Sequence, residues 1–332
     1  MKVKAMAAAS RGADLAPWQY ETPSLGPHDC IIKVRACGLC HTDVHVIDGA
    51  LDPRYPMVPG HEAVGEVVDK GSQVAHLKVG DRVGVGWQRS ACLQCPDCLR
   101  GDENLCAKNQ SVIVNGYGGF GDHLFMDSRF CFLLPAGIST EAGGPLLCGG
   151  VTVYSALKHA GMSGGQEVGV IGVGGLGHMA VQFASKLGNR VTVFTTSADK
   201  ADFAGRIGAH ETVVVRQGEK PAAKRPLDIL LSTVPASLDW NAYLGLLGSD
   251  GTLSTVGLLT EPISVQPFLL MLGRRRLTGS VIGGRAILTE MLEVADRFGV
   301  APIVESFPLS EVNKAIRKVR DNTIRFRAVL KV

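Results

Sequence analysis

The sequence has little net charge and no long uninterrupted apolar stretch. Its 34 Lys and Arg residues nearly balance 31 Asp and Glu residues, so the net charge is +3, too small to indicate binding to nucleic acid or to a membrane surface. The N-terminus has basic residues but no apolar core of a secretion signal. The most apolar stretch, residues 168–184, contains several glycines and His178, so a strand, a turn and a helix explain it better than a membrane span. We therefore predict a cytoplasmic protein.

The sequence also lacks the features of a disulfide framework. Its nine cysteines are odd in number, no export signal precedes them, and the chain is large. Metal binding is therefore the leading explanation for the cysteines as a group. Cys37 is interpreted as a structural thiol, whereas Cys30 and Cys131 are given no role.

Length and composition favour a globular protein of about two domains. The chain has 332 residues, of which 45% are hydrophobic and 20% charged, and this balance predicts a packed core rather than disorder. The 41 glycines stand between apolar runs and indicate many tight turns in a strand-rich or α/β protein. Residues 1–148 are predicted to be β-rich, with strands over residues 31–36, 61–68 and 82–85.

Four cysteines occur together within this β-rich part. Their spacing is typical of a structural zinc site, in which four thiolates close a tetrahedron and leave no open position. Unligated loop thiols are the alternative, but so many exposed thiols would be an oxidation liability. An iron–sulfur cluster is the chemical rival, but the bacterial run has a last spacing of three and a following proline, and neither is present. The four candidate ligands are Cys92, Cys95, Cys98 and Cys106.

A dinucleotide-binding unit is predicted after residue 149. A helix over 151–158 precedes a strand over 166–171, a helix over 178–188 and a second strand over 190–194. The glycine fingerprint lies between the first strand and the second helix, where Gly172 permits a tight turn, Gly174 lets a pyrophosphate approach, and Gly177 lets helix and strand pack. The helix N-terminus then faces the anion. An ordinary glycine turn is the alternative, but the flanking strands favour a dinucleotide.

The end of the second strand indicates which dinucleotide binds. An NAD site usually has Asp or Glu there for the ribose 2′-hydroxyl, but this chain has Thr195, Thr196 and Ser197, followed closely by Lys200. Three hydroxyls and a lysine suit a 2′-phosphate, so NADP is favoured, although Asp199 is a mild objection. A helix cap at Thr196 or Ser197 is the alternative.

The remaining elements complete a doubly wound sheet and return to the first domain. Strands are predicted over 228–233, 251–256 and 277–281, helices over 286–298 and 309–319, and a closing strand over 327–332. The fold class is therefore α/β. We expect residues 1–148 and 286–332 to form a β-rich catalytic domain with both zinc sites, and residues 149–285 to form the NADP-binding domain.

Cys40, His61 and Cys148 are candidate ligands of a second, catalytic zinc. Two thiolates and one imidazole leave a fourth position for water or substrate. Such a zinc polarises a carbonyl oxygen or lowers the pKa of an alcohol, and a nicotinamide beside it can exchange hydride. A Cys and a His so far apart are more often core or turn residues, and only their combination with the nucleotide motif favours the zinc site.

Together these motifs resemble the zinc-dependent medium-chain dehydrogenase/reductase family, specifically its cinnamyl alcohol dehydrogenase branch and the related bacterial aldehyde reductases of broad substrate range. The resemblance implies a GroES-like catalytic domain, a Rossmann domain with the active site between the two, and a dimer or tetramer. The motifs that carry it are residues 38–45, 59–62, 145–154 and 172–178 and the four-cysteine loop, extended by residues 195–197.

The resemblance also implies roles for individual residues. Cys40, His61 and Cys148 match the catalytic zinc ligands, and the four cysteines match the structural zinc ligands. Near the catalytic metal, Thr42 matches the hydroxyl that contacts the reacting oxygen, His45 the outer end of the proton relay, Asp43 the partner of the ligand histidine, and Glu62 a carboxylate beside the metal. The cofactor-binding candidates are His41 at the pyrophosphate, Thr152 near the nicotinamide, and Gly172, Gly174, Gly175, Leu176, Gly177, Thr195, Thr196, Ser197, Lys200, Thr233, Val256 and Ser280.

The predicted function is the reversible reduction of an aldehyde to a primary alcohol with NADPH. An enone reductase of the same family is the alternative, but such relatives tend to lose the relay that Thr42 and His45 provide here. A non-catalytic NADP-binding protein is the alternative of another class, and the intact ligand set argues against it. Trp87 and Phe120 either line the substrate pocket or belong to the core, so the sequence does not rank aromatic against aliphatic substrates.

Overall fold

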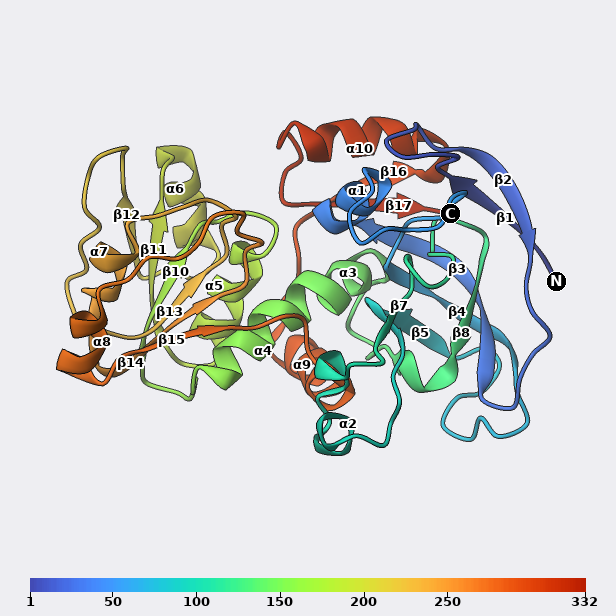
Figure 1. Ribbon diagram of the computed structural model, residues 1–332, viewed down its shortest axis with the longest axis horizontal. Coiled ribbons are helices and arrows are strands. Elements are labelled where there is room, and N and C mark those ends of the chain that lie inside the picture. Colours follow the sequence, from blue (N-terminus) through green and yellow to red (C-terminus); the bar gives the residue numbers. More distant parts are fainter. The chain divides into compact units, whose positions relative to one another are not determined.

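Strands from the first part of the chain and from its end form a seven-stranded sheet in the computed structural model, which describes residues 1–332 (Figure 1). The strand order is β16-β17-β3-β4-β5-β9, and β8 also pairs with β3. All pairs are antiparallel except β16 with β17. The strands are β3 (Asp29–Leu39), β4 (Glu62–Lys70), β5 (Arg82–Val85), β8 (His123–Asp127), β9 (Cys131–Leu133), β16 (Val304–Pro308) and β17 (Arg327–Lys331).

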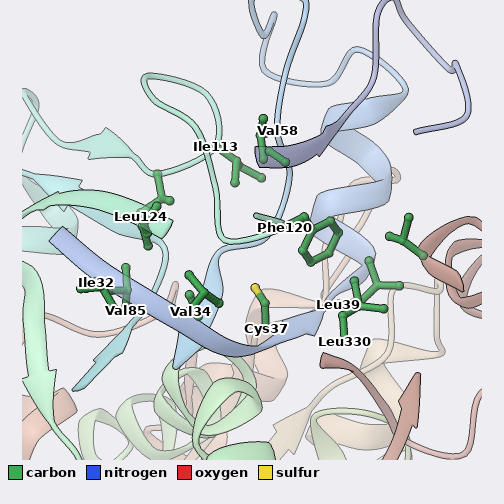
Figure 2. Packing of buried hydrophobic residues seen from close by; sticks show 14 of the residues in the cluster. Ile32, Val34, Cys37, Leu39, Val58, Val85, Ile113, Phe120, Leu124 and Leu330 are labelled. Atoms are coloured by element: carbon green, nitrogen blue, oxygen red, sulfur yellow. The ribbon is translucent and has the colours of Figure 1, made fainter. Parts of the chain in front are cut away.

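Strand β3 contributes several residues to the hydrophobic core of this unit. Its residues Ile32 and Val34 are buried whereas Lys33 and Arg35 are exposed, as a strand with one covered face requires. Figure 2 shows these apolar side chains in one cluster with Phe120, which comes from a loop and is fully buried. Phe120 is therefore a core residue, and it lies close to the site described below.

Two small sheets and several short helices complete the first unit. The helix α1 was not predicted, because seven residues are too few for a clear helical period. The small sheets pair β1 (Lys2–Ala7) with β2 (Ala16–Glu21), and β6 (Gln88–Ser90) with β7 (Gln110–Ser111). The helices are α1 (His41–Ile47), α2 (Pro96–Arg100), α3 (Thr140–Pro145), α9 (Arg285–Phe298) and α10 (Val312–Arg320), with 3-10 turns at Glu103–Leu105, Ser128–Phe130 and Leu309–Glu311 and a π-helical turn at Leu146–Gly150.

The second unit is a six-stranded, fully parallel sheet in the order β12-β11-β10-β13-β14-β15. This is the order of a doubly wound nucleotide-binding fold and confirms the predicted α/β class. Strand β12 was not predicted, because it is a short and incompletely buried edge strand. The strands are β10 (Glu167–Ile171), β11 (Arg190–Thr195), β12 (Glu211–Val214), β13 (Leu227–Ser232), β14 (Leu247–Thr255) and β15 (Arg276–Gly279), and the helices are α4 (Val151–His159), α5 (Gly177–Lys186), α6 (Ala198–Arg206), α7 (Trp240–Leu244) and α8 (Pro267–Gly273).

The end of the chain returns to the first unit because β17 pairs with β3, with Ala328 opposite Leu39. None of the helices is both long enough and apolar enough to span a membrane. The first unit comprises residues 1–148, 283–296 and 301–332, and the second comprises residues 149–282 and 297–300.

Candidate functional site

The four-cysteine loop brings its thiols together within the first unit. The four Sγ atoms lie within 4.8 Å of one another, and Cys92 Sγ is 3.9 Å from Cys98 Sγ. Zinc–sulfur bonds of about 2.3 Å give a tetrahedron with edges of about 3.8 Å, so the spacing fits zinc. Helix α2 starts at Pro96, immediately after Cys95, and ends at Arg100. The next residue, Gly101, has φ +88° and turns the chain back toward the fourth cysteine.

Backbone N–H groups prepare this loop for an anionic sulfur. The N–H of Cys95 donates to Cys92 Sγ at 3.4 Å, and such bonds from Gln94 and Cys95 lower the pKa of Cys92 to about 6. Burial instead raises the pKa of Cys98 to about 12. Cys92 is therefore a thiolate at neutral pH, whereas a metal would have to displace the proton of Cys98.

The second cluster joins Cys40, His61, Glu62 and Cys148. One ligand atom from each lies within 4.8 Å of the others, and all four residues are buried. His61 Nε2 is 3.3 Å from Cys148 Sγ, close to the edge of about 3.6 Å expected between nitrogen and sulfur ligands of one zinc. The structure thus assembles three predicted zinc ligands and Glu62 from distant parts of the chain.

Local backbone conformation presents each ligand of this cluster. Cys40 is the N-cap residue of α1, and His61 directly precedes β4. Cys148 lies in the π-helical turn Leu146–Gly150, a type of bulge that often occurs at functional sites. That turn was not predicted from the sequence.

Asp43 ties two of the ligand-bearing segments together. Its Oδ2 accepts the N–H of Cys40 at 3.0 Å, and its Oδ1 accepts the N–H of Gly60 and the Nδ1–H of His61, both at 2.9 Å. This assigns the proton of the neutral imidazole to Nδ1 and leaves the lone pair of Nε2 available for a metal. Asp43 is fully buried, so these protein donors take the place of water at its carboxylate.

The charges of the cluster are strongly coupled. The hydrogen bond with Cys148 lowers the pKa of Cys40 well below its ordinary value, while the same contact and burial raise the pKa of Cys148. Burial lowers the pKa of His61, but Asp43 and Cys40 together outweigh burial and the net shift of this pKa is upward. Thiolate, imidazole and carboxylate donors fit a divalent cation, which on binding would take the place of these protons.

Arg327 is a site residue that the sequence analysis missed. Its guanidinium donates a hydrogen bond to Oε1 of Glu62, and both side chains are buried. Oε2 of Glu62 is buried without a hydrogen-bond partner, and Oε1 is 3.9 Å from His61 Nε2. The Glu62 carboxylate is thus part of the cluster and is only partly used by Arg327, which is the arrangement expected if Glu62 approaches a metal there. Arg327 is 265 residues from Glu62 in the sequence, so no local motif connects it with the cluster.

Helix α1 carries the two residues predicted to move a proton. The Thr42 hydroxyl lies 3.6 Å from Cys40 Sγ, so it is at the cluster. His45 lies on the exposed face of the same helix, with its ring 6.1 Å from that of His41. Burial lowers the pKa of His41. The structure thus brings Thr42 to the ligands and leaves His45 at the surface.

The predicted cofactor residues of the second unit gather at the carboxyl edge of its sheet. Gly172 has φ +87°, and a Cβ on Gly177 would lie 1.9 Å from the carbonyl oxygen of Gly172, so both positions require glycine. A Cβ on Gly174 would meet nothing within 4 Å, which leaves room for a ligand. Gly175 and Leu176 continue this turn into α5, Thr233, Val256 and Ser280 follow β13, β14 and β15, and Thr152 is buried in the first turn of α4.

The segment after β11 leaves polar groups available for a phosphate. Thr195 is buried, and its Oγ1 accepts the N–H of Ser197. Ser197 is the N-cap residue of α6, but its side chain makes no capping hydrogen bond. Thr196 and Lys200 are exposed, as is Asp199. Ser197 thus occupies the N-cap position that the alternative predicted, but its hydroxyl does not cap the helix.

Other residues considered in the sequence fall around the cluster or in the core. Trp87 is half-buried and packs edge-on against His61, with ring centroids 5.3 Å apart. Cys37 is buried, and burial raises its pKa, in agreement with a structural thiol. Cys30 and Cys131 form a buried thiol pair with sulfurs 3.5 Å apart.

A doubly wound nucleotide sheet in one unit and a Cys–His–Cys cluster in the other define a two-domain, zinc-dependent dehydrogenase. Residues 26–136 match the family model Alcohol dehydrogenase GroES-like domain, and residues 175–304 match the family model Zinc-binding dehydrogenase. The chain belongs to this family of zinc-binding alcohol dehydrogenases, in the cinnamyl alcohol dehydrogenase-like branch.

Similar proteins of known name cover the whole chain. It is 40% identical to aldehyde reductase AdhA of Synechocystis sp. over 330 residues. The aligned region covers 99% of this chain and 98% of the relative. It is 40% identical over 342 residues to a probable cinnamyl alcohol dehydrogenase of Populus deltoides, with 100% and 96% covered. Its fold matches a cinnamyl alcohol dehydrogenase of Sorghum bicolor with a TM-score of 0.93 at 36% identity, covering 100% and 98%. It matches CAD from Helicobacter pylori complexed with NADP(H) with a TM-score of 0.91 at 30% identity, also covering 100% and 98%.

Proposed function

We propose that the protein reversibly reduces aldehydes to primary alcohols, with NADPH as hydride donor. The observation that carries the proposal is the buried cluster of Cys40, His61 and Cys148, since three ligands of these types leave one zinc position for substrate. When bound, zinc polarises the substrate carbonyl and NADPH supplies the hydride. Relatives named aldehyde reductase and cinnamyl alcohol dehydrogenase support this reaction class.

The alcohol product needs a proton, which we assign to Thr42 and His45. Thr42 lies at the ligand cluster, and His45 lies at the exposed face of the same short helix. A hydroxyl at the reacting oxygen and an imidazole at solvent are suitable inner and outer ends of a proton path. Their presence also favours carbonyl reduction over the alternative enone reduction.

The neighbouring polar residues hold this site in shape. Asp43 fixes the tautomer of His61, and the Arg327 guanidinium restrains Glu62 beside the ligands. The four-cysteine loop is assigned to a second, structural zinc because all its corners are filled by protein. We therefore expect two zinc ions per chain.

We propose NADP rather than NAD as the physiological cofactor. The end of β11 has no carboxylate, while the Ser197 side chain makes no capping hydrogen bond and Lys200 is exposed nearby. These groups suit a 2′-phosphate. His41 is assigned to the pyrophosphate and Thr152 to the nicotinamide region, and the remaining contacts are assigned to Gly172, Gly174, Gly175, Leu176, Gly177, Thr195, Thr196, Thr233, Val256 and Ser280.

We propose a homodimer, or a tetramer built from dimers, formed through β15. This strand is the edge of the parallel sheet, and an unpaired edge is a template for pairing with another copy. The apolar side chains of Phe268, Met271 and Leu272 on the adjacent α8 are exposed, which marks an interaction surface.

A cytoplasmic location is proposed because the metal-binding thiols of the protein require a reducing compartment.

The proposed function is tested by metal analysis combined with NADPH oxidation over short aliphatic, long aliphatic and aromatic aldehydes. Two zinc ions per chain and turnover of at least one aldehyde class are expected. One zinc per chain, held by the four-cysteine loop alone, would instead identify a non-catalytic NADP-binding protein. Reduction of the carbon–carbon double bond of an enone, without carbonyl reduction, would identify the enone reductase.

A further inference from the structure

Residues 118–120 lie directly against the segment that leads into His61. The contact is made by the backbone, since three N–H groups of this loop donate to three carbonyl oxygens before His61. The bonds run from Gly118 to Val58 at 2.8 Å, from Gly119 to Gly60 at 2.6 Å, and from Phe120 to Pro59 at 3.0 Å.

The two backbones are too close for a side chain to fit between them. A Cβ on Gly118 would lie 2.4 Å from the carbonyl oxygen of Pro59 and 2.7 Å from that of Gly60. Because those atoms are backbone, only a shift of the Pro59–Gly60 segment would relieve the clash. A Cβ on Gly119 would lie 2.6 Å from Cβ of Ala63. The close approach of these segments therefore depends on the two glycines.

Gly60 is held from opposite directions. Its N–H donates to Asp43 Oδ1, and its carbonyl accepts the N–H of Gly119. Its φ is +101°, and a Cβ there would lie 2.5 Å from the ring of Phe120, so the ring covers the α-carbon. Figure 2 shows this ring within the buried cluster. The residue immediately before His61 has little freedom to move.

Strand β1 and Ala8, the residue directly after it, support both segments. Ala5 of β1 bridges to Gly121, and Ala8 bridges to Met57. The N–H of Met6 also donates to the carbonyl of Phe120 at 2.8 Å. The contacting segments are thus fixed to each other and to the same short stretch, residues 5–8.

An aromatic cluster fixes the other end of the loop. The ring of Tyr117 lies 4.3 Å from that of Tyr20 and 5.1 Å from that of Trp18, both on β2. Because Tyr117 directly precedes Gly118, the loop is anchored on each side of the two glycines.

We infer that residues 118–120 form a positioning clamp for the zinc ligand His61. Asp43 sets the rotation and tautomer of the imidazole, but the location of Nε2 depends on the backbone of Gly60, and the clamp fixes that backbone. This inference rests on the proposed function, because it concerns how well the Cys40–His61–Cys148 cluster holds zinc. These residues touch neither substrate nor cofactor in this role.

The inference is tested by comparing wild-type protein with Gly118→Ala and a control from the same loop, Gly116→Ala. The control methyl group would meet the flexible end of Arg89, 2.5 Å away, and the carbonyl oxygen of Val112 at 3.0 Å, but not the Pro59–Gly60 backbone. Zinc release is followed with a colorimetric chelator, and the cobalt-substituted protein is followed by its visible absorption. The four-cysteine site of the same chain is an internal reference.

Gly118→Ala should release its catalytic-site zinc at least about tenfold faster and shift the cobalt absorption, because changes that displace a ligand's support weaken metal sites by about 10- to 100-fold. The four-cysteine zinc should be released at the wild-type rate in every variant, and Gly116→Ala should match wild type at both sites. Wild-type zinc release and an unshifted cobalt spectrum in Gly118→Ala would overturn the clamp. A wild-type protein with zinc at the four-cysteine site alone would instead overturn the proposed function.

Phe120→Leu gives a second test if Gly118→Ala does not fold. It keeps the backbone bonds and removes the ring that covers Gly60, so zinc release from the catalytic site should accelerate while the four-cysteine site is unaffected. Equal release from wild type and Phe120→Leu, with an unchanged cobalt spectrum, would count against the clamp.

Discussion

Arg327 and Glu62 form a buried ion pair at the Cys40–His61–Cys148 cluster, with the guanidinium donating to Oε1 of the carboxylate. Arg327 begins β17, and Glu62 begins β4 directly after His61. Burial lowers the pKa of Arg327, but Glu62, Cys40 and Cys148 together outweigh burial and raise it. The arginine therefore stays charged and offsets the negative charge that gathers around the ligands.

Removing Arg327 should destabilise the protein far more than removing a surface arginine. Arg327→Met leaves the Glu62 carboxylate buried and unpaired, which costs about 3–5 kcal/mol. Arg35→Met is the matched control, because Arg35 pairs with Glu66 at the surface with 45% and 43% of the side chains exposed, and such pairs contribute about 0–1 kcal/mol. Free energies of unfolding from urea titrations of zinc-loaded protein provide the comparison. Equal losses in the two variants would show that the buried pair has no special weight.

The sequence predicts the local parts of this site well and its long-range parts poorly. Cys40 and the four-cysteine loop lie in short motifs whose residue types already indicate a metal. Arg327 has no such motif, and only the pairing of β17 with β3 brings it to the site. The π-helical turn at Cys148 depends on packing of buried residues that no periodicity reveals. Likewise, the glycines at 118 and 119 are unremarkable until the fold places them against residues 58–60.

Asp43→Asn should weaken zinc binding at the catalytic cluster without affecting the four-cysteine site. The carboxylate accepts three N–H groups with its two oxygens, whereas an amide has only one acceptor oxygen. At least one of the three hydrogen bonds is therefore lost. The expected loss of zinc affinity is about 10- to 100-fold. Asp48→Asn is the control: Asp48 directly follows the same helix and pairs with Arg320 at the surface, so this variant should retain both zinc ions. Zinc per chain after equilibration with metal buffers measures the effect, and two tightly held zincs in Asp43→Asn would contradict it.

Alkaline pH should destabilise the protein through Tyr20. Burial, with the charge of Asp122 and the neighbouring Tyr117, raises the pKa of Tyr20 in the folded state. The unfolded chain then loses this proton first, near pH 10, so stability from the neutral phenol is complete below pH 10 and decreases above it by up to about 1.4 kcal/mol per pH unit. Tyr20→Phe has no such proton to lose.

The Tyr20 prediction is checked by urea unfolding of both proteins from pH 8 to pH 11. The difference in unfolding free energy between wild type and Tyr20→Phe should be constant up to about pH 10 and then shift against wild type. A difference that stays constant throughout would mean that the phenol ionises as readily in the folded protein as in the unfolded chain.

Ser197 should decide between the two nicotinamide cofactors. It follows β11, and its hydroxyl is not used to cap α6. Ser197→Asp places a carboxylate where NAD-binding proteins have one, so it should repel a 2′-phosphate and accept a ribose 2′-hydroxyl. We expect the ratio of kcat/KM for NADPH to that for NADH to fall by about tenfold or more, equivalent to at least about 1.4 kcal/mol. Ser197→Asn has the same shape without the charge, so a large fall in this neutral variant would assign the effect to size. An unchanged ratio in Ser197→Asp would mean that the 2′-phosphate binds elsewhere.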